Sequence, residues 1–283
     1  MPVLLPPALE LFLDLLRCPT CRTRSLSPDR GALRCPVGHT FDVARHGYAS
    51  MLTGIRATSG DDAAMVQARS RFLAAGAYAP LRAVVTDLVA DAVSDQATVV
   101  DVGCGTGYYL AGVLDQLTGA RGLGLDTSVR ALRAAARVHE RAAAVAWDVF
   151  RPFPLADGVA DVVLDVFAPR NPAEFHRVVR PTGRLIVVRP TGRHLAELRG
   201  RLPAMITVDP AKEQRLHGAL APFFDSVITE QVEYCVPLTR QAALDLVAMT
   251  PSARHMSPAD LADDHPLPDQ VTVSVLATAY QPR

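Results

Sequence analysis

The chain has 283 residues, of which 49% are hydrophobic, so it can form one large domain or two smaller ones with a substantial core. Its 29 basic and 29 acidic residues cancel, which excludes a global basic field for a nucleic-acid partner but leaves room for a local basic patch. Its five cysteines show no disulfide framework, so the composition excludes the small disulfide-rich secreted class and favours the cytoplasm.

Residues 1–16 are rich in apolar side chains but also contain Glu10 and Asp14. The segment lacks a basic start and a cleavage site, and it is too short to span a bilayer. We therefore expect a short amphipathic helix here and no association with a membrane.

Residues 17–46 form a turn-rich segment with two pairs of metal-ligand residues. Cys18 and Cys21 enclose two residues, and a stretch of thirteen residues separates Cys21 from Cys35, which His39 follows. Two such knuckles close a tetrahedron of three thiolates and one imidazole around Zn²⁺, and four protein ligands leave no open position for catalysis. The pattern predicts one structural zinc ion, and the alternative is a chance placement of cysteines in a reduced core.

The zinc segment is also locally basic. Arginine on a zinc knuckle suits contact with phosphate, and a merely solvated face is the alternative interpretation. Only Asp29 and Asp42 oppose the arginines of this segment, which are Arg17, Arg22, Arg24, Arg30, Arg34 and Arg45.

The middle of the chain changes from helical to alternating patterns. From residue 60 to 94 apolar residues recur at a spacing of three to four, which predicts two bridging helices. From 97 to 188 short apolar runs alternate with helical stretches, a pattern typical of βαβ units and of a parallel sheet with helices on both faces. We expect strands at residues 98–102, 121–125, 143–147, 161–166 and 184–189.

The end of the chain adds helices around 209–222 and at 239–249, and two strands at 226–236 and 271–280. A late strand running back against a parallel sheet is what a seven-stranded methyltransferase that uses S-adenosylmethionine (SAM) would show. We therefore predict an α/β chain with three parts. They are an N-terminal helix and zinc module (1–58), a helical bridge (59–95) and a Rossmann-like SAM-dependent methyltransferase domain (96–283).

A glycine-rich loop follows the first strand expected in this last domain. It places Asp101, Gly103, Gly105 and Gly107 at alternate positions, whereas dinucleotide-binding loops set the third glycine one residue later. Glycines let the backbone approach a ligand where the next helix begins. The loop therefore predicts a SAM site rather than a nicotinamide site.

Acidic residues follow the next two expected strands. Asp126 can accept both ribose hydroxyls of SAM, and Asp148 can accept from the adenine amine. The alternative is that each carboxylate caps the N-terminus of a helix. The remaining residues that we assign to the cofactor site are Leu110, Thr127, Val149 and Tyr78.

Four blocks of the sequence resemble the guanine-N1 methyltransferases of 23S ribosomal RNA, a family that includes the tylosin and mycinamicin resistance enzymes of antibiotic producers. The blocks are the zinc module with residues 39–48, residues 60–81, the glycine loop with its acidic partners, and a discontinuous set at 167–169, 178–183 and 249–252. The resemblance covers residues 17–280 and implies a zinc module that helps to hold an rRNA hairpin. It also implies a C-terminal domain that methylates one guanine.

Methylation of guanine N1 sets chemical demands, because N1 carries a proton and is buried in base pairs. The base must be unpaired, and a general base or hydrogen bonds to O6 must help. We expect Asp165, at the carboxyl end of the fourth strand, to act as that base or to accept the N1 proton, with a strand-end cap as the alternative. Arg170 and Asn171 would contact O6 or phosphate, and Phe167 would support the base or the methionine moiety of SAM. Candidate pocket walls, or else packing residues, are Arg69, Tyr78 and Arg254.

Two other functions stay open at this point. A methyltransferase of the same ancestry could act on a small natural product, which the neutral charge favours, as do Ala77 and Arg254, where the family has histidine and an aromatic residue. A non-catalytic RNA-binding protein could keep SAM as a structural ligand, but the complete acidic series argues against it. The expected partner is a 23S rRNA hairpin, and a homodimer is an assembly that the sequence permits.

Overall fold

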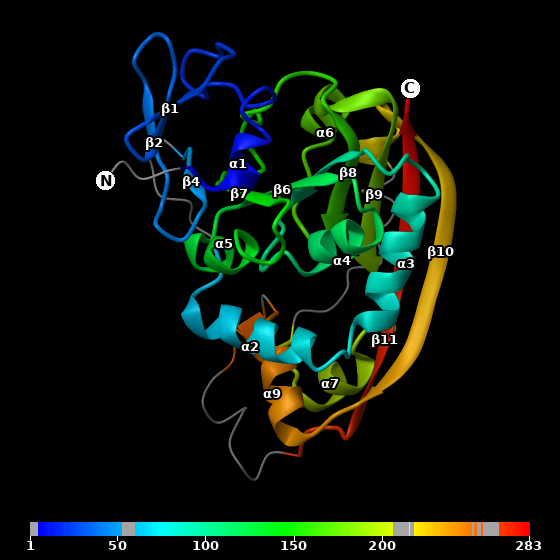
Figure 1. Ribbon diagram of the computed structural model, residues 1–283. Helices are drawn as coiled ribbons and strands as arrows, with labels where there is room; N and C mark the ends of the chain where they lie inside the picture. The colour runs from blue at the N-terminus through cyan, green and yellow to red at the C-terminus, as the bar shows by residue number, and fades with distance from the viewer. Residues whose placement is uncertain are drawn as a thin grey trace.

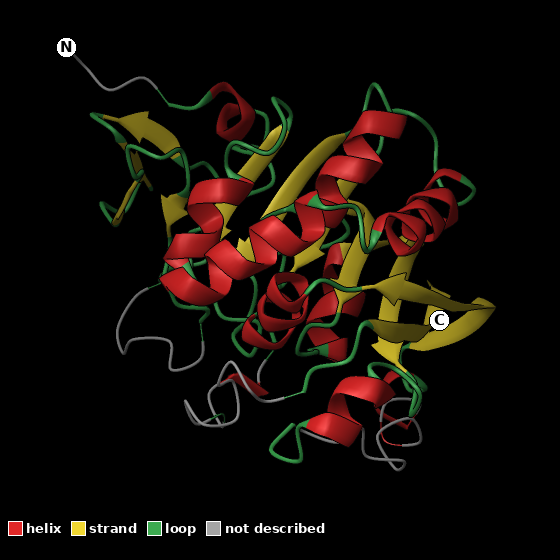
Figure 2. Ribbon diagram, turned by 90° about the horizontal axis from the view of Figure 1, so that it is seen from below, coloured by secondary structure: helices red, strands yellow, loops and turns green. Residues whose placement is uncertain are grey.

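The computed structural model describes residues 5–52, 60–205, 215, 218–250, 252–253, 256 and 266–283. Their strands form one three-stranded and one eight-stranded sheet, and helices pack on the larger one (Figures 1 and 2). The three-stranded sheet and the long edge strand β10 lie at opposite ends of the molecule. Arg254 and most of the helix expected around 209–222 lie outside the described residues.

The large sheet has the order β10-β11-β9-β8-β5-β6-β7-β4. Strands β4 to β9 pair in parallel, whereas β11 runs antiparallel between β9 and β10. This arrangement confirms the expected methyltransferase fold with its late antiparallel strand. The strand bounds are β4 Ala49–Ser50, β5 Thr98–Val102, β6 Arg121–Asp126, β7 Ala142–Ala146, β8 Ala160–Val166, β9 Val179–Pro190, β10 Phe224–Pro237 and β11 Gln270–Pro282.

Hydrophobic residues cover both faces of this sheet. Along β8, Val162 and Leu164 pack into one buried cluster and Val163 into another, as alternating side chains of a strand do. Helices therefore flank the sheet on both sides, as the sequence predicts. Their bounds are α1 Pro7–Glu10, α2 Ala63–Ala74, α3 Ala79–Ala90, α4 Tyr108–Gln116, α5 Val129–Ala135, α6 Pro172–Val178, α7 Ala196–Arg201 and α9 Arg240–Ala248.

The two helices expected between residues 60 and 94 are present as α2 and α3. Asp62 caps α2 by accepting from the backbone N–H of Met65 at 2.9 Å. Pro80, in the first turn of α3, starts that helix without losing a hydrogen bond. Among the described residues no single helix is long and apolar enough to cross a membrane. Helices α2 and α3 reach that length and apolar composition only when taken together, and the pair is bent by 83°.

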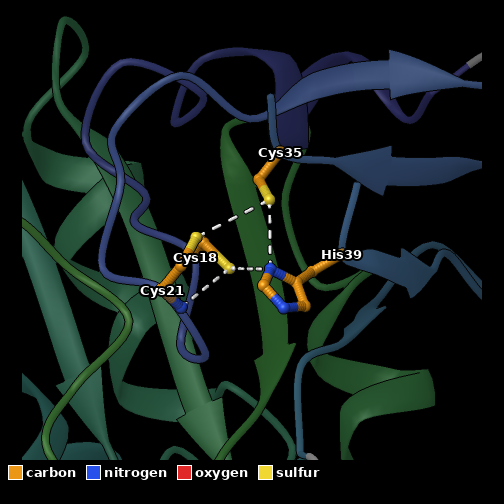
Figure 3. Close-up of side chains that lie close together, drawn as sticks. All are labelled: Cys18, Cys21, Cys35 and His39. Atoms are coloured by element: carbon orange, nitrogen blue, oxygen red, sulfur yellow. Dashed lines mark hydrogen bonds between the residues drawn. The ribbon is translucent and has the colours of Figure 1, made fainter. Parts of the chain in front are cut away.

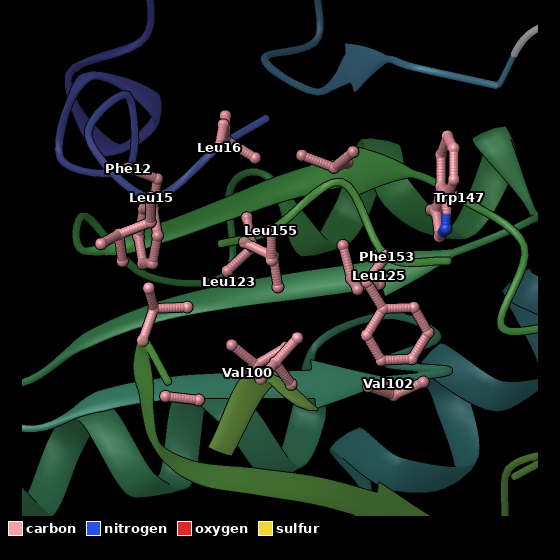
Figure 4. Packing of buried hydrophobic residues seen from close by; sticks show 14 of the residues in the cluster. Phe12, Leu15, Leu16, Val100, Val102, Leu123, Leu125, Trp147, Phe153 and Leu155 are labelled. Atoms are coloured by element: carbon pink, nitrogen blue, oxygen red, sulfur yellow. The ribbon is translucent and has the colours of Figure 1, made fainter. Parts of the chain in front are cut away.

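The N-terminal segment departs from the expected amphipathic helix. Only one helical turn, α1, forms, and it is followed by turns and by a bridge between Leu16 and Leu155. Its apolar side chains pack against the strands of the large sheet (Figure 4), so tertiary contacts rather than a helical face bury Leu9 and Phe12.

The zinc segment contains more regular structure than a turn-rich stretch. Strands β1 (Ser27–Asp29), β2 (Ala32–Arg34) and β3 (Thr40–Asp42) form an antiparallel sheet. Strand β4 then joins the large sheet as a parallel edge next to β7, an eighth strand that the sequence did not indicate. Leu33 and Phe41 share one buried cluster with the sheet residues Val100 and Leu123. The expected domain limits at residues 58 and 95 stay a prediction.

Candidate active site and metal centre

The structure brings the four predicted metal ligands together at one point (Figure 3). Their ligand atoms all lie within 4.8 Å of one another. The Sγ atoms of Cys21 and Cys35 are 3.7 Å apart, and Nδ1 of His39 is 3.3 Å from Sγ of Cys35 and 3.6 Å from Sγ of Cys18. A tetrahedral zinc ion with Zn–S bonds of about 2.3 Å separates its sulfur ligands by about 3.8 Å. The four residues therefore fit one Zn²⁺.

The local backbone favours metal binding at this centre. The backbone N–H of Cys21 points at Sγ of Cys18, at 3.5 Å, which is the turn that a two-residue spacing produces. The side chain of Thr23 lies 3.1 Å from Sγ of Cys21 and lowers the pKa of that thiol to about 6. Thiolate, rather than thiol, is the ligand form, so this environment suits the ion.

Part of the arginine set of the zinc segment binds to the methyltransferase domain. Arg17 lies 3.6 Å from the Asp157 carboxylate, and Arg22 donates to the Phe153 carbonyl at 3.3 Å. Arg34 pairs with Asp29 at 3.2 Å. The exposed arginines of the segment are Arg24, Arg30, Arg34 and Arg45.

The glycine loop between β5 and α4 is shaped for close approach. Gly103, Gly105 and Gly107 all have positive φ, a conformation that disfavours side chains. A Cβ on Gly103 would lie 2.5 Å from Cβ of Ala168, in the segment that follows β8. The loop therefore packs directly on the segment where substrate is expected.

Three carboxylates lie at or just beyond the carboxyl ends of β5, β6 and β7, which are neighbours in the sheet. Oδ2 of Asp101 is buried and has no hydrogen-bond partner among the described residues, and burial raises the pKa of Asp101 to about 7. Asp126 accepts from the backbone N–H groups of Gly105 at 2.9 Å and Ser128 at 2.7 Å. The unpaired oxygen and the glycine cradle fit a cationic nucleoside ligand such as SAM.

Helix capping, the alternative role considered for Asp126 and Asp148, is not observed. Ser128, not Asp126, caps α5, by accepting from the backbone N–H of Ala131 at 3.2 Å. Asp148 accepts from the backbone N–H of Phe150 at 3.0 Å in a turn, and no described helix begins there.

The other predicted cofactor residues differ in accessibility. Leu110 is 1% exposed and packs beneath the loop on Gly122 of β6, so it supports the site from the core. Thr127 and Val149 are half-buried beside Asp126 and Asp148.

The end of β8 and the segment after it hold the expected catalytic residues. Asp165 is fully buried, and its Oδ1 lies 3.1 Å from Nε of Arg170. Asn171 caps α6 by accepting from the backbone N–H of Glu174 at 3.4 Å, and it donates to the Val149 carbonyl at 2.9 Å. Asn171 thus ties this segment to the end of β7.

Phe167 belongs to an aromatic group that the sequence did not reveal. Its ring stacks on His194, with centroids 5.7 Å apart, and lies 6.3 Å from the ring of Tyr78. Tyr78 also meets Phe72 edge-on at 5.4 Å. No motif marks His194, and only the fold brings it beside residues from the start of α3 and the end of β8.

Arg69 of α2 connects three distant parts of the chain. It pairs with Asp61 at 2.8 Å, donates to the Met249 carbonyl at 2.9 Å, and its Nη1 lies 3.0 Å from where a Cβ on Gly105 would stand. Arg69 therefore lies over the glycine loop, as expected for a wall of the pocket.

Comparisons with known proteins agree with this geometry. Residues 16–53 match the family model of the zinc ribbon described as "RlmA, N-terminal", and residues 99–183 match a model described as "Methyltransferase domain". In solved structures, a Haloferax volcanii complex of the Trm112 methyltransferase activator with a provisionally named methyltransferase has a TM-score of 0.53. It is 18% identical and covers 79% of this chain and 99% of that chain, which supports the fold.

Curated relatives match nearly the whole length. The 23S rRNA (guanine(748)-N(1))-methyltransferase of Streptomyces fradiae is 44% identical, covering 94% of this chain and 96% of the relative. A Micromonospora griseorubida protein, provisionally named a 23S rRNA (guanine-N(1)-)-methyltransferase, is also 44% identical, with coverages of 96% and 98%. The chain, with its zinc ribbon and SAM-dependent methyltransferase domain, thus belongs to the family of 23S rRNA (guanine-N1)-methyltransferases.

Proposed function

We propose that the protein transfers the methyl group of SAM to N1 of a guanine in a hairpin of 23S rRNA and so protects a ribosome from a macrolide. One observation carries the proposal. A four-ligand zinc centre and a SAM loop occur in a chain whose relatives over nearly its full length are named for this reaction. The reaction would take place in the cytoplasm, where ribosomes are.

The cofactor residues would hold SAM at the carboxyl edge of the sheet. Asp101 would accept from its positively charged part, Asp126 from the ribose hydroxyls and Asp148 from the adenine amine. Bound SAM would supply an activated methyl group. N1 would give its electron pair to the methyl carbon, the electron pair of the carbon–sulfur bond would go to sulfur, and the N1 proton would leave to a base or to water.

We assign Asp165 to orienting Arg170 rather than to the base role expected from the sequence. The Asp165 carboxylate is already paired with the Arg170 guanidinium at 3.1 Å, so it serves as the partner of a cation rather than as a free proton acceptor. The guanidinium that it holds suits a phosphate of the target nucleotide. Asn171 would position the same segment against Val149 at the cofactor edge.

The zinc module would contribute exposed arginines to the RNA surface. Arg24, Arg30 and Arg45 are exposed, while Arg17 and Arg22 fix the module against the methyltransferase domain. Replacing an exposed arginine should weaken RNA binding and reduce its salt dependence.

A homodimer would appear as a doubled mass in sedimentation equilibrium.

The test is methyl transfer from labelled SAM to two acceptors, unmodified 23S rRNA and a macrolide. We expect label in the RNA alone and none with Asp126→Ala, which removes a carboxylate of the cofactor site. Label in the macrolide instead would establish the small-molecule function and contradict the proposal.

A further inference from the structure

His194 is a buried histidine for which the reaction outlined above has no role. It follows β9, is 9% exposed, and its Nδ1 accepts from the backbone N–H of Ser274 at 3.2 Å. A ring nitrogen that accepts from an N–H carries no proton, so the imidazole must carry its hydrogen on Nε2. Burial, with the nearby Arg199, lowers the pKa of His194 to about 4, in agreement with this neutral form.

This tautomer fixes the direction of the next hydrogen bond. Nε2 of His194 lies 3.5 Å from the hydroxyl of Tyr78, so the imidazole donates and the hydroxyl oxygen accepts. The hydroxyl hydrogen of Tyr78 must then point elsewhere. Tyr78 is 3% exposed, and no residue in the described part of the chain accepts that hydrogen. Burial raises the pKa of Tyr78, so the hydroxyl stays protonated and remains a donor.

A buried donor without an acceptor is destabilising, so an acceptor is expected when the site is filled. The aromatic neighbour of Tyr78 indicates which ligand supplies it. Phe167 stacks on His194 with one face and is still 39% exposed. A partly exposed aromatic ring at the carboxyl edge of the sheet can serve as a stacking platform for an unpaired base.

The backbone of Phe167 supports a functional placement. Its φ of +56° lies in the left-handed region, which is costly for a bulky side chain. Ala168, the next residue, packs on Gly103 of the cofactor loop. The ring is thus held, against its conformational preference, where a base would lie beside the cofactor.

We propose that Tyr78, oriented by His194, donates its hydroxyl hydrogen to O6 of the target guanine while the base stacks on Phe167. The assignment rests on the proposed function. As N1 loses its proton to water and its electron pair forms the bond to the methyl carbon, negative charge develops on O6. Tyr78 stabilises that charge and keeps its own proton, and the sulfur takes the electron pair of the broken bond. His194 is a positioning residue that acts through Tyr78. This assignment moves Tyr78 from the expected cofactor site to the substrate site.

The test is the dependence of kcat on pH, measured with the full chain at saturating SAM and 23S rRNA. We expect Tyr78→Phe to lower kcat by about 100-fold at neutral pH. We also expect the rise of kcat to move to higher pH by about one pH unit, because N1 of the bound guanine loses its proton less readily without the donor. SAM affinity, measured by calorimetry, should not change.

Variants of His194 separate positioning from packing. His194→Leu should move the pH profile in the same direction as Tyr78→Phe, and His194→Gln should restore part of kcat, because an amide N–H can replace the Nε2 donor. Tyr234→Phe is the matched control. The Tyr234 hydroxyl donates to the carbonyl of Ala77 at 3.1 Å, so its loss disturbs the start of α3 without removing a donor to substrate. Its pH profile should match that of the wild type.

Three results would overturn the assignment. An unmoved pH profile in Tyr78→Phe would make the hydroxyl structural, and weaker SAM binding with normal kcat at saturation would return Tyr78 to the cofactor site. A wild-type protein that forms no N1-methylguanine in 23S rRNA would overturn the proposed function and this assignment with it. Thermal unfolding of each variant identifies any variant that fails to fold. If Tyr78→Phe or a His194 variant does not fold, the pH profile of the other one tests the assignment.

Discussion

The absence of a side chain at Gly103 lets the glycine loop pack against the segment that follows β8. A Cβ there would lie 2.5 Å from Cβ of Ala168, and φ is +73°. Gly158 has a φ of +61°, and apart from its chain neighbours no described residue lies within 4 Å of a Cβ built there. Gly158→Ala therefore isolates the free-energy cost of the left-handed backbone, about 1 kcal/mol. We expect Gly103→Ala to lower the free energy of unfolding, measured in urea, by about 1–3 kcal/mol more than Gly158→Ala does, because the added methyl group overpacks the site. Gly103→Ala should also abolish SAM binding in calorimetry. Equal losses in the two variants would show that the loop tolerates the methyl group.

Asp101 couples stability to pH at the same edge. Its folded-state pKa of about 7 lies above the ordinary value of 3.8, so the folded protein keeps a proton that the unfolded chain releases. Stability therefore falls as pH rises from about 4 to 7. We expect Asp101→Asn to be more stable than the wild type at pH 8 and equal to it below about pH 4 in unfolding curves. The variant should also bind SAM about 10–100-fold more weakly at pH 8, because it lacks the carboxylate. A variant with unchanged SAM affinity would remove Asp101 from the cofactor site.

Between elements, one ion pair fastens α2 to α9. Arg71 donates to both carboxylate oxygens of Asp245, at 2.9 and 2.6 Å, and lowers the pKa of this carboxyl. A carboxyl group with a lowered pKa in the folded state stabilises the fold at pH values above its unfolded-state pKa. That contribution is lost as the pH falls through the folded-state pKa. Since the arginine side chain is 54% exposed, we expect Asp245→Asn to cost about 1 kcal/mol at pH 7.

The difference between Asp245→Asn and the wild type should shrink below about pH 4. Asp225→Asn is the control, because the Arg283–Asp225 pair is about equally exposed on both sides and should contribute almost nothing. Denaturant titrations at several pH values measure both variants. A penalty for Asp245→Asn that does not depend on pH would rule out the ion pair as its cause.

Sequence patterns predicted those elements whose signal is local. The seven strands from β5 to β11 show runs of apolar or alternating residues, and the zinc ligands follow a fixed spacing, so both were predictable. Strand β4 has two residues and α1 has four, Pro7–Glu10, so both are too short for any periodicity. Both elements are set by contacts with the large sheet.

In the candidate site too, residues marked by a local sequence pattern were predictable and residues brought together only by the fold were not. The positions of the acidic residues were predictable because each is at or just beyond the carboxyl end of a strand in a parallel sheet, and these ends meet at one edge. His194 was not, because its partners Tyr78 and Phe167 belong to other elements and a single histidine carries no pattern. We propose a different role for Asp165 because the sequence could not show that Arg170 folds back onto its carboxylate.

Across the whole molecule, the zinc module and the methyltransferase sheet share one buried cluster. The single tryptophan, Trp147, lies in that cluster with Leu33 and Phe41 of the zinc module. Figure 4 shows Trp147 with Phe12 of the N-terminal segment in the same cluster. We therefore expect one cooperative transition, with tryptophan fluorescence and far-UV circular dichroism coinciding.

Loss of zinc should lower the midpoint of that single transition, because metal binding stabilises only the folded state. The protein should contain about one zinc per chain by metal analysis. Cys18→Ala should lose the zinc, whereas Cys235→Ala, an exposed cysteine outside the centre, should keep it. Full zinc occupancy in Cys18→Ala would contradict the metal assignment, and two separate transitions would contradict the shared core.

The central claim is that this zinc-containing methyltransferase modifies N1 of one guanine in 23S rRNA. The most direct measurement is primer extension on unmodified 23S rRNA after incubation with the protein and SAM, because a methyl group on N1 blocks base pairing and stops reverse transcription. The account predicts a new stop one nucleotide before a single guanine, present with the wild type and absent without SAM. Methyl label in the RNA without such a stop, or no label at all while SAM still binds, would contradict it.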